Sequence, residues 1–219
     1  MNNRRFFLKN FSLLTLTGFT SSHLLEAANT CKNKLTPKQS LGPFYPEQFK
    51  LEKDADLTQL RGHKQKAKGR LVHISGNVQD EFCKPIVNAI VEVWQACYSG
   101  RYNHPSDTSE EALDPHFQYY AMMKTDSKGK YSFKTIVPGA YKASPNWMRP
   151  PHIHYKVSLR GYQSLVTQLY FSGEKFNRED GILNSLTLEE RKKVIVDFKK
   201  DNKGVLKGNF NIFLKKHSL

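Results

Sequence analysis

Cysteine is scarce in this 219-residue chain, which has only Cys31, Cys83 and Cys97. Three cysteines are too few for a disulfide-dense scaffold, their spacing lacks the Cys-x-x-Cys pattern of zinc sites, and the sequence alone assigns no pair. The 13 glycines and 10 prolines exclude a collagen-like or low-complexity chain. No run of about 18 apolar residues occurs, which excludes a bundle of membrane-spanning helices. What remains is a globular chain with 38% hydrophobic residues.

Acidic residues are also few relative to basic ones. The 20 Asp and Glu residues stand against 34 Lys and Arg residues, for a net charge of +14. Such an excess attracts phosphates, so nucleic-acid binding is one interpretation. The densest basic cluster, between Arg61 and Arg70, lies in a stretch with Gly and His that is typical of a solvated connector. We therefore predict no nucleic-acid partner and interpret the charge as general basicity or as attraction for small anions.

The N-terminus predicts an export signal over residues 1–28. The run Arg4-Arg5-Phe6-Phe7-Leu8-Lys9 resembles the twin-arginine signal, and a modestly apolar segment follows it. This pattern predicts only a transient contact with the membrane and a periplasmic or cell-envelope location. The alternatives are an amphipathic helix or a chance pair of arginines, and no small-x-small cleavage pattern stands near Ala27 and Ala28.

After the signal, short extended segments alternate with turn residues. Alternating apolar positions predict strands over residues 71–74, 86–95, 131–133, 152–159, 165–171, 194–198 and 210–214. The run from Asp126 to Gly129 predicts a hairpin turn, and Thr187 with Glu190 has the spacing of a helix capping box. We predict a mainly β fold: a β-sandwich with long loops and one or two short helices. It forms a single domain over residues 29–219, of which residues 29–36 are a linker.

The strongest chemical pattern is His152-Ile153-His154 in a predicted strand. Alternate side chains of a strand share a face, so both imidazoles can face one metal ion while Ile153 enters the core. Such pairs are also ordinary surface or core residues. A carboxylate ligand would indicate Fe(II) and cysteines would indicate zinc or copper, but neither stands close in the sequence. Phenols such as Tyr102 and Tyr141 would favour a hard trivalent ion, although nothing in the pattern selects these two from ten tyrosines.

A series of motifs makes a family resemblance specific. The chain resembles the intradiol ring-cleavage dioxygenases, in particular the iron-binding beta-type subunit of protocatechuate 3,4-dioxygenase. The matching segments, in order, are Gly42-Pro43-Phe44-Tyr45-Pro46, Gly69-Arg70-Leu71-Val72, Val91-Glu92-Val93-Trp94-Gln95-Ala96, Gly100-Arg101-Tyr102, Tyr131-Ser132-Phe133-Lys134-Thr135-Ile136, Arg149-Pro150-Pro151-His152-Ile153-His154 and Gln168-Leu169-Tyr170-Phe171.

The resemblance implies a non-haem Fe(III) cofactor and four ligands at matching positions. These are Tyr102, Tyr141, His152 and His154. It implies that a catechol-type substrate displaces Tyr141, which then helps take a substrate proton, and that O2 cleaves the ring between the two hydroxyl-bearing carbons to give a muconate-type diacid. It further implies that Arg149 stabilises negative charge on the ring and that Gln168 orients Arg149.

The chain departs from the family pattern at Ala143, where protocatechuate enzymes carry Trp. The shape of the ring pocket is therefore open, and the substrate stays open among catechol, protocatechuate, hydroxyquinol and bulkier diols. The resemblance implies a homo-oligomer or an alpha-type partner subunit. The alternative function is an exported, non-catalytic β-sandwich binding module. A cupin-like or extradiol Fe(II) enzyme would need a carboxylate ligand that the sequence does not indicate.

Overall fold

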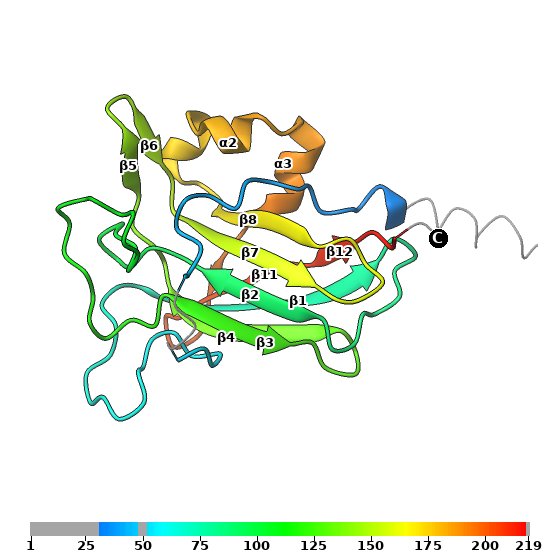
Figure 1. Cartoon of the computed structure of the whole chain (residues 1–219), viewed down its shortest axis with the longest axis horizontal. Coiled ribbons are helices and arrows are strands. Elements are labelled where there is room, and N and C mark those ends of the chain that lie inside the picture. Colours follow the sequence, from blue (N-terminus) through cyan, green and yellow to red (C-terminus); the bar gives the residue numbers. More distant parts are fainter. Residues whose placement is uncertain (1–30, 48–51, 218–219) are drawn as a thin grey trace, which may run out of the picture.

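The structure, a computed structural model, describes residues 31–47 and 52–217, so the predicted signal lies outside it. Two five-stranded sheets pack face to face (Figure 1). In the first, the order is β10 (Lys199–Lys200), β11 (Leu206–Asn209), β1 (Leu71–Asp80) and β12 (Ile212–Leu214), and β4 (Lys130–Ile136) pairs antiparallel with β1. β11 and β12 both run parallel to β1, alongside its first and second halves. The predicted β-sandwich is confirmed.

The second sheet carries the histidine strand near its centre. Its order is β3 (Tyr120–Lys124), β2 (Ile90–Trp94), β7 (His152–Ser158), β8 (Leu165–Phe171) and β9 (Ile195–Val196). A separate hairpin of β5 (Tyr141–Ser144) and β6 (Trp147–Arg149) stands at one end of the sandwich (Figure 1). This hairpin has no counterpart among the predicted strands.

Alternating burial decides which face of each strand enters the core. Val72, Ile74 and Val78 of β1 are fully buried, whereas His73 and Ser75 between them are exposed. From the other sheet, Ile153 and Tyr155 of β7 enter the same apolar cluster. The opposite face of β7 carries the histidines, so the candidate site lies on the outer face of the second sheet rather than between the sheets.

The predicted hairpin at residues 126–129 is wrong in its pairing. The turn exists: Asp126 Oδ1 accepts hydrogen bonds from the backbone N–H groups of Lys128 and Lys130. However, β3 before the turn pairs with β2, and β4 after it pairs with β1 in the other sheet. Turn chemistry reverses the chain locally, but the partner of each strand depends on which sheet buries its apolar face.

The predicted helix is confirmed as α3 (Leu188–Val194), with a complete capping box. Thr187 Oγ1 accepts from the Glu190 N–H, and the Glu190 carboxylate accepts from the Thr187 N–H. Two shorter elements, the 3₁₀ helix η1 (Lys175–Arg178) and α2 (Gly181–Asn184), precede it beyond the β8 edge (Figure 1). Among the residues described, no helix is both long and apolar enough to cross a membrane.

Residues 31–47 form a segment that we call the N-terminal strap. A disulfide joins Cys31 to Cys83, which follows β1, while Cys97 is buried and unbonded. The Thr36 N–H donates to the Phe213 carbonyl over 3.2 Å, and Thr36 Oγ1 accepts from the Phe213 N–H over 2.9 Å. Beyond these anchors the strap crosses the outer face of the second sheet (blue in Figure 1).

The disulfide predicts a measurable loss of stability when it is removed. The Cys31→Ala/Cys83→Ala variant should lose about 2–4 kcal/mol of unfolding free energy, because a crosslink restricts the unfolded chain. Denaturant unfolding measures the difference. A thiol reductant should lower the stability of the native sequence by a similar amount and leave the variant unchanged. Equal effects of reductant on both proteins would contradict the prediction.

Candidate functional site

His152 and His154 project from the same face of β7, as predicted. Their Nε2 atoms lie 3.2 Å apart, and each residue is only 2% exposed. Pairing on both edges fixes the strand, since His154 lies opposite Trp94 of β2 and Gln168 of β8. The intervening Ile153 is fully buried in the core, so the alternation of the strand accounts for the pair.

Two glycines bring the distant tyrosines together. The loop before Tyr102 and the loop before Tyr141 touch backbone to backbone, with the Gly139 N–H donating to the Cys97 carbonyl over 2.9 Å. A Cβ on Gly139 would lie 2.3 Å from Gly100 N, and a Cβ on Gly100 would lie 2.5 Å from the Ala140 carbonyl oxygen. Only glycine permits this approach, and Gly100 also adopts a φ of +91°.

The two tyrosines meet the histidine pair. Tyr102 Oη lies 3.4 Å from His152 Nε2. The rings of Tyr102 and Tyr141 have centroids 5.6 Å apart, and the rings of Tyr141 and His152 are 5.7 Å apart. Two donors bound about 2.1 Å from one metal ion would lie about 3.0–3.4 Å apart, which is the spacing seen between these nitrogen and oxygen atoms.

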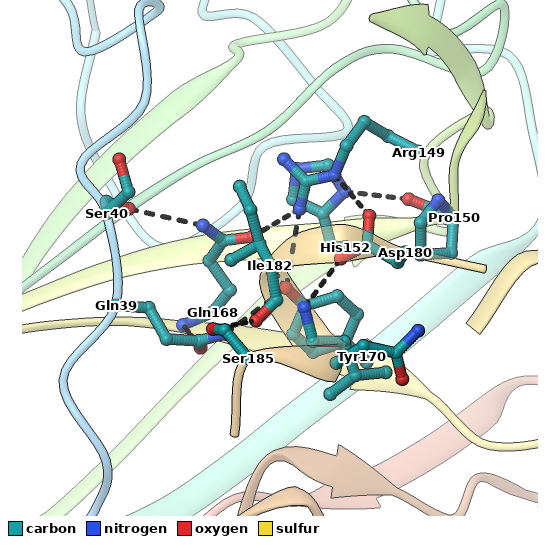
Figure 2. Close-up of polar contacts among 12 residues, drawn as sticks. Gln39, Ser40, Arg149, Pro150, His152, Gln168, Tyr170, Asp180, Ile182 and Ser185 are labelled. Carbon is teal, nitrogen blue, oxygen red and sulfur yellow. Dashed lines mark hydrogen bonds and ion pairs between the residues drawn. The ribbon is translucent and has the colours of Figure 1, made fainter. Parts of the chain in front are cut away.

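Both imidazoles are neutral and one tautomer is fixed. His152 Nδ1 donates to the Pro150 carbonyl over 2.7 Å, so the lone pair of His152 is on Nε2 and faces His154 (Figure 2 shows the Pro150 contact). Burial, with the nearby charge of Arg149, lowers the pKa of His154 to about 3. Burial, Arg149 and His154 together hold the pKa of His152 well below its usual value. Both side chains therefore offer a lone pair at neutral pH.

The phenols need a cation in order to ionise. Burial raises the pKa of Tyr102 well above its usual value, and the neighbouring Tyr141 adds to the shift. Burial also raises the pKa of Tyr141, but the charge of Arg149 opposes that rise. The charge of Arg149 also opposes the raised pKa of Tyr102, so it favours the ionised form of both phenols without overcoming their burial. A metal ion between the four side chains would supply the remaining positive charge.

These four side chains fit a hard metal ion as a donor set. They offer two neutral nitrogens and two phenol oxygens, all aimed at one region and none of them a thiol. Within residues 31–47 and 52–217 no group of three or more His, Cys, Asp and Glu side chains has metal-binding geometry. Phenolate ligands suit a trivalent ion, because the ion must displace a proton held above pH 10.

Arg149 lies beside this donor set because of the β5–β6 hairpin. Register places Arg149 directly opposite Tyr141. Its Nε donates to Asp180 over 2.6 Å, and its Nη2 donates to Gln168 Oε1 over 2.7 Å and to the Tyr170 hydroxyl over 3.3 Å (Figure 2). The contact expected between Gln168 and Arg149 is therefore present.

A cavity of about 460 Å³ opens against these residues. Tyr141, Arg149 and His154 line it, whereas Tyr102 and His152 do not. Ala143 is also in the lining, and the indole of Trp147 reaches the same cavity from the facing strand. The lining is completed by Ser40, Gly42, Pro43, Phe44, Gly100, Ser106, Asp107, Thr108, Ser109, Lys142 and Ile182.

Sequence reasoning missed two carboxylates that hold the site. Asp180 is fully buried, pairs with Arg149, and accepts the Leu183 N–H as the N-cap of α2. Asp107 Oδ2 accepts the Tyr102 N–H over 2.7 Å. An Asp that begins a short helix is a recognisable cap signal, but nothing local indicates its partner Arg149.

Residues of the N-terminal strap cover the side chains that form the metal-donor set. Phe44 stacks on Tyr102 with ring centroids 4.5 Å apart. A Cβ on Gly42 would lie 3.1 Å from His154 Cε1. The ring of Trp94 stacks on the same imidazole, with centroids 4.9 Å apart. The histidine is therefore held between the strap and β2.

The chain is similar in sequence to several known dioxygenases. A family model described as a dioxygenase matches residues 41–216. The chain is 39% identical over 151 residues to the protocatechuate 3,4-dioxygenase beta chain of Burkholderia cepacia, which covers 68% of this chain and 64% of that protein. It is 34% identical over 125 residues to catechol 1,2-dioxygenase 2 of Acinetobacter lwoffii, over 51% of this chain and 44% of that protein. The matches thus span less than two thirds of these relatives.

Solved structures agree in fold. The dioxygenase domain of a dioxygenase and carbohydrate-binding protein fusion from Streptomyces sp. SirexAA-E superposes with a TM-score of 0.64 at 25% identity, over 84% of this chain and 99% of that one. The 3-chlorocatechol 1,2-dioxygenase of Rhodococcus opacus 1CP gives 0.68 at 20% identity over 90% and 79%, which is a likeness of fold alone. These matches do not support the alternative of a binding module. The chain belongs to the intradiol ring-cleavage dioxygenase family.

Proposed function

We propose that this protein is a non-haem Fe(III) dioxygenase that cleaves a catechol-type ring between its two hydroxyl-bearing carbons with O2. The observation that carries the proposal is the convergence of two neutral imidazoles and two phenols beside a cavity. Among their donor atoms, His152 Nε2 lies 3.2 Å from His154 Nε2 and 3.4 Å from Tyr102 Oη. Tyr102, Tyr141, His152 and His154 would hold the iron. Bound Fe(III) would supply Lewis acidity and would draw electron density from the diol.

The chain's own residues would bind the diol and manage its charge. Tyr141 Oη, as a phenolate, accepts a proton from a substrate hydroxyl. The adjacent Arg149 stabilises the negative charge on Tyr141 before the transfer and on the substrate oxygen after it. Arg149 then stabilises negative charge on the reacting ring, since a guanidinium stays charged at any working pH. Both oxygen atoms of O2 enter the muconate-type diacid, so the reaction needs no external reductant.

We propose a protocatechuate-like specificity as the first case to test. The matched beta chain is named for protocatechuate, and relatives named for catechol, chlorocatechol and 6-chlorohydroxyquinol are also similar to this chain. The decisive experiment measures O2 uptake and products with protocatechuate, catechol and hydroxyquinol. A diacid formed with one O2 per diol supports the proposal, and an aldehyde-bearing product from cleavage outside the diol contradicts it.

We further propose assembly as a homo-oligomer or with an alpha-type partner subunit. Analytical ultracentrifugation of the purified protein tests this assembly.

Tyr102→Phe should weaken iron binding by about tenfold or more and change the tyrosinate-to-Fe(III) absorption in the visible spectrum. Loss of a residue that only supports a metal ligand already lowers metal affinity about 10–100-fold, and loss of a ligand itself should lower it at least as much. Iron content per chain and the spectrum check this outcome. Tyr98→Phe is the matched control, since Tyr98 lies in the same loop but is 37% exposed. Full iron, colour and turnover in Tyr102→Phe would show that Tyr102 is not a ligand.

Arg149→Ala should lower turnover about 10²–10³-fold, the usual effect of removing an electrostatic stabiliser, while iron stays bound. Alone, the change would also leave Asp180 buried without its partner, at a cost of about 3–5 kcal/mol in unfolding free energy. The Arg149→Ala/Asp180→Asn variant removes both charges and keeps a cap for α2, so it should recover stability but not turnover. Loss of iron with unchanged turnover per iron would instead assign Arg149 to structure.

We propose a periplasmic or cell-envelope location reached by the twin-arginine route. The Cys31–Cys83 disulfide supports it, because such bonds persist in oxidising compartments. Among divalent ions, copper and zinc generally outcompete iron for nitrogen and oxygen ligands, so folding around iron before export would secure the right metal.

The Arg4→Lys/Arg5→Lys variant should therefore stay in the cytoplasm as active, iron-loaded protein. Cell fractionation with an activity assay measures this. Unimpaired export of the variant would reject the twin-arginine route. Export of unfolded chain with full iron loading would reject the metal argument and leave the catalytic proposal standing.

A further inference from the structure

The strap forms hydrogen bonds with the unpaired part of the β8 edge, beside Arg149. β9 pairs with β8 at Tyr170 and Phe171, and within the described residues no strand lies along the preceding part of this edge of β8. Gln39 bonds to this part of the edge: its N–H donates to the Val166 carbonyl over 2.8 Å, and its side-chain Oε1 accepts the Gln168 N–H over 2.9 Å. One residue of the strap thus takes the place of a neighbouring strand at the residue that contacts Arg149.

The other end of the Gln39 carboxamide reaches the Arg149 cluster. Gln39 Nε2 donates to the Tyr170 hydroxyl over 3.3 Å, and Arg149 Nη2 donates to the same oxygen (Figure 2). With two donors already directed at it, the Tyr170 hydroxyl turns its own proton toward Gln168 Oε1, 3.0 Å away. The hydrogen bonds therefore run in one direction, from Gln39 through Tyr170 to Gln168.

That direction determines how Gln168 is held. Its Oε1 accepts from both Tyr170 and Arg149, while its Nε2 donates to the Ser40 carbonyl of the strap over 3.1 Å. If the Gln168 carboxamide rotated by 180°, its NH2 group would face the donors of Tyr170 and Arg149, and its oxygen would face the Ser40 carbonyl. Nε and Nη2 of Arg149 are thus committed to Asp180, Gln168 and Tyr170, and no described residue accepts a bond from Nη1. Because Arg149 lines the cavity, Nη1 remains available to a bound diol.

We infer that Gln39 is a positioning residue of the proposed reaction: it sets the hydrogen-bond direction through Tyr170 and Gln168 that presents Arg149 Nη1 to the cavity. The inference rests on the proposed function. Gln39 does not line the cavity, so it acts only through these partners. It also links catalysis to the strap, which a disulfide fastens at Cys31.

Gln39→Ala should lower kcat about tenfold, the equivalent of one hydrogen bond in the transition state. Iron per chain and the affinity for catechol, titrated without O2, should stay unchanged, because Gln39 touches neither the donors nor the cavity. Gln163→Ala is the matched control: Gln163 precedes β8, is exposed, and has no side-chain hydrogen bond among the described residues. It should leave kcat, iron content and affinity at their native values.

A double-mutant cycle separates positioning from simple strap anchoring. Tyr170→Phe removes the relay hydroxyl, and it should lower kcat about tenfold with iron retained. Adding Gln39→Ala to Tyr170→Phe should then lower kcat little further, since both substitutions break the same series of hydrogen bonds from Gln39 through Tyr170 to Gln168. If the double variant instead shows the product of the two single-variant losses in kcat, or if Gln39→Ala loses iron, the inference is overturned in favour of a structural role. If Gln39→Ala does not fold, native kcat in Tyr170→Phe overturns it equally.

The outcomes also separate this inference from the proposed function. Lost turnover in Arg149→Ala/Asp180→Asn together with native turnover in Gln39→Ala would overturn the role of Gln39 alone. Native turnover in the Arg149 variant would overturn the role of Arg149 and that of Gln39 with it. The absence of any diol cleavage by the native, iron-loaded protein would overturn the proposed function and this inference together.

Discussion

The buried ion pair between Arg149 and Asp180 holds the candidate site together. Both side chains are almost completely buried, and a charge left unpaired there would cost several kcal/mol. Each partner therefore fixes the element that carries it: Asp180 caps α2, and Arg149 lies on β6 opposite Tyr141 of β5. The pair thereby joins the β5–β6 hairpin to the start of α2 beside the site.

The charge of Arg149 also explains the protonation of its neighbours. It adds to burial in keeping both imidazoles neutral, and it opposes the effect of burial on Tyr141. The two effects suit the same purpose, because a ligand must offer a lone pair and a phenolate needs positive charge nearby. Tyr102 stacks on Phe44, and there too the charge of Arg149 opposes the rise in pKa that burial causes.

The strap has more than an anchoring role. Its residues pack on Tyr102, pass over His154 and complete the hydrogen bonds of Gln168, all on the outer face of the second sheet. The site is therefore enclosed by a segment that forms no strand of its own. Since the strap is tied to the body at Cys31 and Thr36, enclosure of the site and stability of the N-terminal region are coupled.

By itself the sequence determined the local features: the alternation of β1 and β7, the shared face of His152 and His154, the capping box of α3 and the family motifs. Each depends on residues that are neighbours along the chain, so its physics is visible in the sequence. Tertiary structure alone decided the pairing of β3 and β4 with different sheets, the Cys31–Cys83 bond, the contact of Gly100 with Gly139 and the ion pair of Arg149 with Asp180. These join residues far apart in the chain, and which distant groups meet depends on how the whole core packs rather than on any local pattern.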